Sequence, residues 1–357
     1  MIQKIAVLGL GKVGSLVATL LSSKYKITGI DQSQFLDNFS FDVENIDVSD
    51  AASIRQVLKN MDAVVSCLPY FLNIKIAEIA VQMGVHYFDL TEDVPTLHAI
   101  QKMSSESHVA LVPQCGLAPG FIGILGAGLY QSFSKIRSVE LRVGAIPLHP
   151  KGQLGYSFTW SADGVINEYL NDAEVIHNGK RKMLASLEDV ELLHINGKKY
   201  EAFLTSGGLG TLCETLEGEV DTLNYKTIRY PGHRNAMKLL LYDLLMKDNR
   251  KQAKAILENA LPLVEEDIVL VYAAVEGIEN GVLKRKEFSE SYRNITIEGK
   301  DWRAISWTTA CSISAVVDMV AEGKLKNKGF IKQEEIPFDM FIQSHYGSMY
   351  EKFKNKK

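Results

Sequence analysis

Short apolar runs alternate with stretches of helical periodicity along the first 115 residues of the chain. Apolar runs are typical of buried strands, and apolar residues at spacings of three and four predict helices between them. The alternation predicts βαβ units around a parallel sheet, so we expect residues 1–120 to form a Rossmann-type, doubly wound α/β domain. Strands are expected at residues 5–8, 27–30, 43–48, 63–65, 85–90 and 109–112, and helices at 12–22, 50–59, 73–83 and 94–107.

Alternation of apolar and polar residues replaces this pattern after Pro119. Asn-Gly pairs that begin at Asn178, Asn196 and Asn280 predict tight turns between strands. We therefore expect residues 121–305 to form an antiparallel-rich α+β domain for substrate binding or dimerisation. The C-terminal segment, residues 306–357, is expected to return to the first domain. Helices are expected at residues 121–133 and 308–321, and strands at 138–143, 222–230, 268–275 and 294–298.

The composition is that of an ordinary globular protein, with 46% apolar and 23% charged residues. A net charge of −4 gives no electrostatic reason to expect nucleic acid or an anionic membrane as partner. The most apolar stretch, residues 116–130, is shorter than the ~20 residues that span a bilayer, and the N-terminus is not typical of a signal peptide. The four cysteines are widely separated and lack the spacing of metal ligands. We expect a cytoplasmic protein with free thiols and no bound metal.

A G-x-G-x-x-G motif lies between the first expected strand and the first expected helix. In this context Gly9 would make the tight turn, Gly11 would let the backbone approach a pyrophosphate, and Gly14 would let the helix pack on the strand. Free N–H groups and the helix dipole would hold the pyrophosphate at the helix N-terminus. The residues expected to bind the dinucleotide here are Gly9, Leu10, Gly11, Lys12, Val13 and Gly14.

Asp31 ends the second expected strand, near the offset of about 20 residues at which such motifs place a ribose-binding acid. A carboxylate there accepts hydrogen bonds from both ribose hydroxyls and repels a 2′-phosphate. Gln32 and Ser33 follow, so no neighbouring Arg or Lys could pair with such a phosphate. We therefore expect NAD rather than NADP; the alternative is that Asp31 only forms a turn.

The ends of the later strands should also face the dinucleotide, because ligands bind at the carboxyl edge of open α/β sheets. Asp47 and Val48 end the third expected strand and are expected along the adenine. Each residue at the ends of the fourth and fifth strands could equally pack in the core or contact the ligand. The residues expected on the nicotinamide side are Cys67, Leu68, Pro69, Leu90 and Thr91.

Three runs, at residues 65–69, 86–91 and 116–120, resemble the saccharopine dehydrogenase-like family. Residues 158–164 and 229–233 resemble, more narrowly, the lysine 6-dehydrogenases. The resemblance implies a Rossmann domain with an α/β substrate domain, usually in a dimer, so a homodimer is expected. It also implies oxidation or reduction at a carbon–nitrogen bond of an amino acid.

Lysine 6-dehydrogenases convert L-lysine and NAD to a semialdehyde, ammonia and NADH, and the resemblance implies this reaction here. Glutamate-forming saccharopine reductases typically use NADP and carry Arg where this chain has Asp163. An acid at that position suits a substrate ammonium, or it caps the helix that begins near Gly164. The alternatives are a saccharopine or carboxynorspermidine-type dehydrogenase or reductase, or a dinucleotide-binding sensor without turnover.

Hydride transfer from an amine-bearing carbon requires the neutral amine, and a lysine ammonium has a pKa of ~10.4. A general base or a desolvated pocket is therefore needed. The candidate bases are Asp89, Glu92 and His233. His233 opens a helix expected at residues 234–245, whose positive end would lower the imidazole pKa; the alternative is that it only braces that helix.

The remaining candidates are polar or aromatic side chains near the expected site. Tyr70 could donate to substrate or could only pack. Arg229 is a candidate partner for a substrate carboxylate because Arg binds carboxylates in a planar fork. Arg234 is the second such candidate. The substrate-binding residues expected are Trp160, Asp163, Tyr169, Arg229 and Tyr230.

Overall fold

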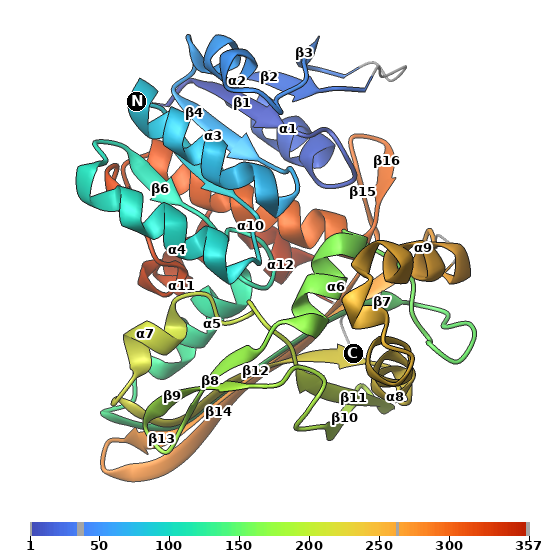
Figure 1. Cartoon of the computed structure of the whole chain (residues 1–357). Coiled ribbons are helices and arrows are strands. Elements are labelled where there is room, and N and C mark those ends of the chain that lie inside the picture. The colour runs from blue at the N-terminus through green and yellow to red at the C-terminus, as the bar shows by residue number, and fades with distance from the viewer. Residues whose placement is uncertain (1, 34–38, 262–263, 355–357) are drawn as a thin grey trace. The chain divides into compact units, whose positions relative to one another are not determined.

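The computed structural model describes residues 2–33, 39–261 and 264–354 and divides the chain into two compact units. Unit 1 comprises Met1–Phe121 and Ser306–Lys352, and unit 2 comprises Ile122–Ile305 and Phe353–Lys357. The chain therefore leaves unit 1 once and re-enters it through a long C-terminal helix (Figure 1). The expected divisions, after residues 120 and 305, lie next to these boundaries.

Unit 1 is built on a parallel sheet in the order β17-β6-β5-β4-β1-β2-β3. The strand order reverses between β1 and β4, which is the switch point at which open α/β sheets bind ligands. This confirms the expected Rossmann-type sheet. The strands are Lys4–Leu8 (β1), Lys26–Asp31 (β2), Asp42–Asn45 (β3), Ala63–Ser66 (β4), His86–Asp89 (β5), Ala110–Val112 (β6) and Gly329–Phe330 (β17). The helices between them are Gly14–Ser22 (α1), Ala51–Leu58 (α2), Tyr70–Met83 (α3) and Val94–Lys102 (α4).

The C-terminal segment completes unit 1. Its strand β17 pairs in parallel with β6, and the Gln333 side-chain amide donates to the carbonyl of Pro113 at 2.8 Å. The Tyr25 hydroxyl donates to Asp318 on α10 at 2.5 Å. In the described part of the chain, α10 is the one helix long and apolar enough to cross a bilayer, and 94% of it is buried inside the protein. The helices of this segment are Ala304–Ala321 (α10), Phe338–Gln343 (α11) and Ser348–Lys352 (α12).

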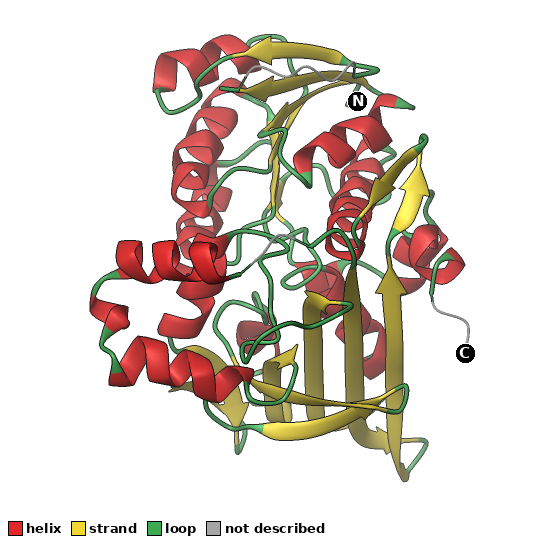
Figure 2. Cartoon of the chain, turned by 90° about the vertical axis from the view of Figure 1, so that its right-hand side faces the viewer, coloured by secondary structure: helices red, strands yellow, loops and turns green. Residues whose placement is uncertain are grey.

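Unit 2 is built on a mixed sheet in the order β10-β11-β12-β7-β13-β14, with β8 and β9 attached beside β12 (Figure 2). The β12–β7 pair is parallel and the other pairs are antiparallel. Its strands are Lys135–Pro147 (β7), Ala173–His177 (β8), Lys180–Leu184 (β9), Glu191–Ile195 (β10), Lys198–Leu204 (β11), Val220–Arg229 (β12), Asp267–Glu279 (β13) and Val282–Arg293 (β14). A separate hairpin contains Ile295–Ile297 (β15) and Lys300–Trp302 (β16), and the helices are Phe121–Tyr130 (α5), Ala162–Leu170 (α6), Leu212–Leu216 (α7), His233–Lys238 (α8) and Arg250–Ala260 (α9).

The three Asn-Gly pairs form the hairpin turns that the sequence predicts. Asn178, Asn196 and Asn280 have φ of 53°, 49° and 55°, and the glycine after each also has positive φ. Two consecutive left-handed residues are the requirement of a type I′ turn. The turns join β8 to β9, β10 to β11 and β13 to β14.

The third expected strand and the helix expected at residues 234–245 are among the elements that differ from the structure. The third strand ends at Asn45 rather than at residue 48, and all four residues of β3 are exposed at the sheet edge. The helix expected at residues 234–245 ends as α-helix at Lys238 and continues as a π-helical turn to Asp243. Leu245 then adopts a φ of 55°, which ends the helical path.

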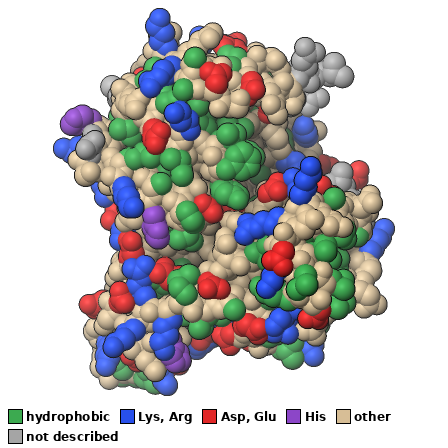
Figure 3. Space-filling model, viewed as in Figure 1, with side chains coloured by type: hydrophobic (Ala, Val, Ile, Leu, Met, Phe, Trp, Pro, Cys, Tyr) green, Lys and Arg blue, Asp and Glu red, His purple; other side chains and the backbone are tan. Residues whose placement is uncertain are grey.

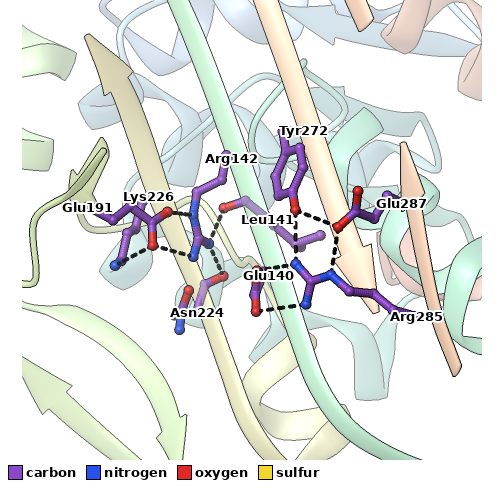
Figure 4. Close-up of polar contacts among 9 residues, drawn as sticks. All are labelled: Glu140, Leu141, Arg142, Glu191, Asn224, Lys226, Tyr272, Arg285 and Glu287. Atoms are coloured by element: carbon purple, nitrogen blue, oxygen red, sulfur yellow. Dashed lines mark hydrogen bonds and ion pairs between the residues drawn. The ribbon is translucent and has the colours of Figure 1, made fainter. Parts of the chain in front are cut away.

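One face of the unit 2 sheet carries paired charges rather than apolar side chains (Figure 4). Arg142 on β7 and Lys226 on β12 are buried and bind Glu191, which Lys226 reaches at 3.0 Å. On the neighbouring strands, Arg285 bridges Glu140 at 2.9 Å and Glu287 at 2.6 Å. Because successive residues of a strand point to opposite faces, the alternate residues of β7, such as Val139, Leu141 and Val143, supply the apolar face.

Candidate functional site

The glycine turn of unit 1 has the geometry that a dinucleotide site requires. Gly9 has a φ of +87°, and a Cβ on Gly14 would lie 1.8 Å from the carbonyl oxygen of Gly9. A Cβ on Gly11 would meet nothing within 4 Å. Gly9 and Gly14 are therefore needed for the turn itself, whereas Gly11 borders open space. Of the other motif residues, Leu10 is buried, Lys12 is exposed and Val13 directly precedes α1.

Asp31 at the end of β2 is joined directly to this turn. Its Oδ2 accepts a hydrogen bond from the backbone N–H of Leu10 at 2.8 Å, and its Oδ1 accepts from Ser33 at 2.8 Å. Each carboxylate oxygen can accept a second hydrogen bond. The carboxylate is thus held beside the glycine turn with acceptor capacity for a ribose. Residues 34–38, which follow, lie outside the described residues.

The two residues expected along the adenine differ in their surroundings. Asp47 is exposed, and its Oδ1 accepts from the backbone N–H of Ser49 at 2.9 Å. Val48 is buried in the apolar core with Ile54 and Val57. The strand ends early and the Val48 side chain lies in the core, so any contact of Val48 with the adenine would be through its backbone.

The end of β4 leads straight into α3. Cys67 donates its backbone N–H to Leu8 at 2.8 Å, and burial together with the charge of Asp89 raises the pKa of its thiol to about 12. Leu68 packs against the core and Pro69 immediately precedes α3. Tyr70 is the first residue of that helix and is half-buried. Cys67 is therefore a neutral thiol, and Tyr70 lies at the carboxyl edge of the sheet.

Asp89 at the end of β5 is fully buried and accepts three hydrogen bonds. The Tyr87 hydroxyl donates at 2.7 Å, and the backbone N–H groups of Thr91 and Gln114 donate at 2.9 Å each. Burial raises the pKa of Asp89 to about 6, although these donors favour the ionised form. The Asp89 carboxylate therefore holds together the segments that follow β5 and β6. Leu90 and Thr91 belong to the first of these segments.

Glu92 follows on the same loop and is half-buried. Burial raises the pKa of its carboxyl group to about 7, and the negative charges of Asp93 and Asp89 add to the rise. A general base is most effective when its pKa lies near the working pH. Of the three bases expected from the sequence, Glu92 combines such a pKa with access to solvent.

Unit 2 brings together Tyr169, Arg229 and His233. The Tyr169 hydroxyl lies 3.0 Å from His233 Nε2 and accepts a hydrogen bond from Arg229 Nε at 3.0 Å. His233 Nδ1 lies 2.8 Å from the carbonyl oxygen of Leu154. All three side chains are buried. The cluster therefore links α6, β12 and α8 through polar contacts inside an apolar core.

The surroundings of His233 do not suit a general base. Burial and the charge of Arg229 lower its pKa to about 3, so the imidazole is neutral at physiological pH. Both ring nitrogens already have partners within the chain. The lowered pKa agrees with the expectation in direction, but its causes are burial and a guanidinium rather than the end of α8.

We predict that His233 makes unit 2 sensitive to acid. Its pKa is below the unfolded value of ~6.5, so the unfolded state binds the extra proton and stability falls as the pH drops from 6.5 toward 3. The expected loss is about 1.4 kcal/mol per pH unit below 6. Chemical denaturation of wild type and His233→Phe at several pH values measures it. Equal slopes in the two proteins would contradict the prediction.

Tyr156, a neighbour of Arg229, and Thr159 were not among the residues expected from the sequence. The guanidinium carbon of Arg229 lies 4.7 Å from the ring centroid of Tyr156. Within the described part of the chain, the hydroxyl of Thr159 is buried without a hydrogen-bond partner. Buried polar groups are normally satisfied, so such groups call for a ligand or a bound water. Their signal in the sequence was the run at residues 154–160, where polar and aromatic residues are mixed.

Asp163 does not have the surroundings that either expectation required. Helix α6 is capped by Ser161, whose Oγ accepts from the backbone N–H of Gly164 at 3.1 Å, so Asp163 is not the cap. The Asp163 carboxylate is 48% exposed and already pairs with the Lys254 ammonium at 2.6 Å. Because α9 packs beside α6, the Lys254 ammonium takes the position at Asp163 that was expected for the substrate ammonium.

The other expected contacts are only partly available. The Tyr230 hydroxyl donates its proton to the carbonyl of Pro147 at 2.9 Å, so it cannot donate the same proton to a substrate. Trp160 packs, half-buried, against the core of unit 2. Arg234 donates to Leu187 and pairs with Glu188 at 2.8 Å. Among the described residues, no group of three or more His, Cys, Asp or Glu side chains is placed to hold a metal ion.

The sheet, its switch point and the glycine turn make unit 1 the nicotinamide-dinucleotide-binding domain of a dehydrogenase. Residues 5–114 match the saccharopine dehydrogenase NADP binding domain, and residues 116–354 match the saccharopine dehydrogenase C-terminal domain. The chain therefore belongs to the saccharopine dehydrogenase family of amino acid dehydrogenases. This confirms the resemblance in the sequence at the level of the family.

Individual relatives are distant. The chain is 24% identical over 288 residues to the mitochondrial alpha-aminoadipic semialdehyde synthase of Rattus norvegicus, which covers 75% of this chain and 31% of that protein. It is 24% identical over 224 residues to the NADP(+), L-glutamate-forming saccharopine dehydrogenase of Saccharomyces cerevisiae, covering 58% and 49%. The chain thus spans less than half the length of these two relatives.

Among solved structures, the apo L-Glu-forming saccharopine dehydrogenase of Saccharomyces cerevisiae has the same fold. The TM-score is 0.73 at 16% identity, with 99% of both chains covered. At this identity the likeness concerns the fold, which it confirms as a Rossmann-type sheet with a second mixed-sheet domain.

Proposed function

We propose that this protein is an NAD-dependent lysine 6-dehydrogenase that oxidatively deaminates the side-chain amine of L-lysine. The observation that carries the cofactor assignment is Asp31, whose carboxylate is hydrogen-bonded to the glycine turn at the place of the ribose. The saccharopine dehydrogenase of Saccharomyces cerevisiae is named for NADP(+), so NAD use would set this chain apart from that relative.

The charge around the expected ribose site supports NAD. NADP carries a 2′-phosphate, which proteins hold with Arg or Lys. The segment from residue 27 to residue 54 contains no Lys, Arg or His. Its acidic residues are Asp31, Asp37, Asp42, Glu44, Asp47 and Asp50. This segment runs from the second residue of β2 through β3. It therefore offers negative charge that repels a phosphate, and no cation that would bind one.

Replacing Asp31 with serine is expected to weaken NADH binding by about tenfold or more, since hydrogen bonds to a charged group contribute about 1.5–3 kcal/mol. The same change should narrow the preference for NADH over NADPH, because the repelling charge is gone. Fluorescence titration with both reduced cofactors measures the two constants. Asp42→Ser, an exposed acid on β3, is the matched control and should leave NADH binding unchanged. Tighter NADH binding by Asp31→Ser would contradict the assignment.

Arg229 is the proposed anchor for the substrate α-carboxylate. Its Nε bond to Tyr169 and an Nη1 bond to the Ile228 carbonyl at 2.9 Å use two of its five N–H groups. The outer edge of the guanidinium can then take a carboxylate in a planar fork. The arginine typical of saccharopine reductases is replaced by Asp163, so one anchored carboxylate, as in L-lysine, suits this unit.

Glu92 is the proposed general base. With a pKa of about 7 it can accept the proton of the substrate ammonium near neutral pH and above. Asp89 fixes the loop on which Glu92 lies. NAD⁺, when bound, would supply the hydride acceptor, and the overall reaction would convert the substrate ammonium, water and NAD⁺ to aldehyde, ammonium ion, NADH and a proton.

A substrate panel with both cofactors tests the proposal. We expect NAD reduction with L-lysine at alkaline pH, with ammonium released in step with NADH. Turnover of saccharopine or carboxynorspermidine in place of lysine would assign the protein to those enzymes. NADH binding without turnover of any amine would favour a dinucleotide sensor. Asp163→Asn should keep the activity of the wild type, because Asp163 is paired with Lys254.

We also propose that the protein works as a cytoplasmic homodimer without a nucleic acid or membrane partner. Its net charge is −4, and Figure 3 shows cationic and anionic side chains interspersed over the visible face. Nucleic-acid-binding proteins typically concentrate cations in a patch or stripe. Light scattering after gel filtration measures the oligomeric state; a monomer at working concentrations would contradict the dimer.

A further inference from the structure

We propose that His233 and Tyr169 are positioning residues that hold the Arg229 guanidinium in one orientation for the substrate carboxylate. The inference rests on the proposed function, in which Arg229 binds that carboxylate. It gives His233 a role that does not involve proton transfer.

The hydrogen bonds of this cluster can run in one direction only. The Leu154 carbonyl, 2.8 Å from His233 Nδ1, can only accept, so Nδ1 carries the proton. In a neutral imidazole Nε2 is then the acceptor, and Tyr169, 3.0 Å away, must donate its hydroxyl proton to it. The Tyr169 oxygen is left to accept from Arg229 Nε, at 3.0 Å. The backbone at Leu154 thereby determines the polarity of every bond up to the guanidinium.

This series of hydrogen bonds fixes the plane of the Arg229 guanidinium. Tyr169 holds Nε and the Ile228 carbonyl holds Nη1, so two corners of the planar group are bonded. The Tyr156 ring lies 4.7 Å from the guanidinium carbon and limits movement on one side. A carboxylate needs two parallel N–H donors, which a rotating guanidinium presents only part of the time. Holding the plane before the ligand arrives reduces the entropy lost on binding.

A purely structural role would not call for a histidine at this position. The imidazole lies parallel to the Phe203 ring at a centroid distance of 6.3 Å and edge-on to Tyr156 at 5.1 Å. A phenylalanine would fill this aromatic space without the cost of burying a titratable group, which here lowers the pKa to about 3. The polar contacts of His233 are therefore what distinguishes it from an apolar side chain.

The test uses His233→Phe, Tyr169→Phe and the double variant, with steady-state kinetics on the substrate that the panel identifies. We expect the KM for the amine to rise about 10- to 100-fold in each single variant, the range of one hydrogen bond to a charged group. kcat and the KM for NAD should change less than about threefold. The double variant should resemble the single variants, because both changes interrupt one chain of bonds. Tyr200→Phe, a buried tyrosine of the same core, is the control and should behave as wild type.

Nitrogen NMR of ¹⁵N-histidine-labelled protein gives a readout that needs no turnover. We expect His233 to show a protonated Nδ1 and a bare Nε2 at every pH from 5 to 9, and the Nε2 resonance to shift in Tyr169→Phe. The opposite tautomer would overturn the inference, as would a fall in kcat at constant KM or additive effects in the double variant. If wild type oxidises no amine while the tautomer is as expected, the proposed function fails and the bond polarity stands. Tyr169→Phe carries the kinetic test should His233→Phe not fold.

Discussion

Gly11→Ala is expected to lower dinucleotide affinity at least 100-fold, about 2.7 kcal/mol, without affecting folding. A Cβ at this position meets no protein atom within 4 Å, so the apoprotein tolerates it. The same methyl group occupies the space through which a pyrophosphate approaches the backbone. The expected result is an unchanged melting temperature with NADH binding lost.

Gly14→Ala is the matched variant and is expected to fail for a different reason. Its Cβ would lie 1.8 Å from the carbonyl oxygen of Gly9, a contact that the turn cannot relieve without moving. We expect a loss of about 3 kcal/mol or more in the stability of unit 1, together with the loss of binding. Differential scanning calorimetry and NADH titration separate the two cases. Equal melting temperatures for Gly11→Ala and Gly14→Ala would contradict the prediction that a Cβ fits at Gly11 and clashes at Gly14.

Arg229→Lys is the second substitution with a large expected effect. Lysine keeps the charge but loses the planar fork and the Nε donor that Tyr169 accepts. We expect kcat/KM for the amine to fall about 100- to 1000-fold, with the KM for NAD unchanged, because two bonds to charged groups are lost together. The measurement is the initial rate of NADH formation over a range of amine concentrations.

The stability of each Arg229 variant must be measured alongside, since the residue is buried. Arg229→Lys with a wild-type melting temperature and wild-type kcat/KM would remove Arg229 from the substrate site. A reduced melting temperature with normal kinetics would leave it a structural role only.

Local patterns in the sequence predicted the parts of the fold that depend on neighbouring residues. The glycine turn, Asp31 and the Asn-Gly hairpins each need only a few adjacent residues, and each was located correctly. Strand β17 was missed because two residues, Gly329 and Phe330, are too short to show a period. Strand β9 was missed because its sequence, Lys180–Leu184, is mostly charged at an exposed position.

The candidate site was harder to predict, because its contacts join residues far apart in the chain. His233 meets Tyr169, 64 residues earlier, and Leu154, 79 residues earlier. Asp163 meets Lys254, 91 residues later. The periodicity of a sequence does not reveal contacts between residues so far apart. His233 was therefore expected as a base and Asp163 as a substrate contact. Only the folded chain shows that one is desolvated and the other already neutralised.

The position of β17 has a consequence for how the chain folds during synthesis. Unit 1 receives its last strand, which covers the edge of β6, only after residues 122–305 of unit 2 have been made. At the ribosomal rate of 5–20 residues per second, the interval is about 10–40 s. During that time the edge of β6 has unpaired backbone groups, and exposed strand edges are where newly made chains associate. The nascent protein should therefore depend on chaperones more than the small size of either unit suggests.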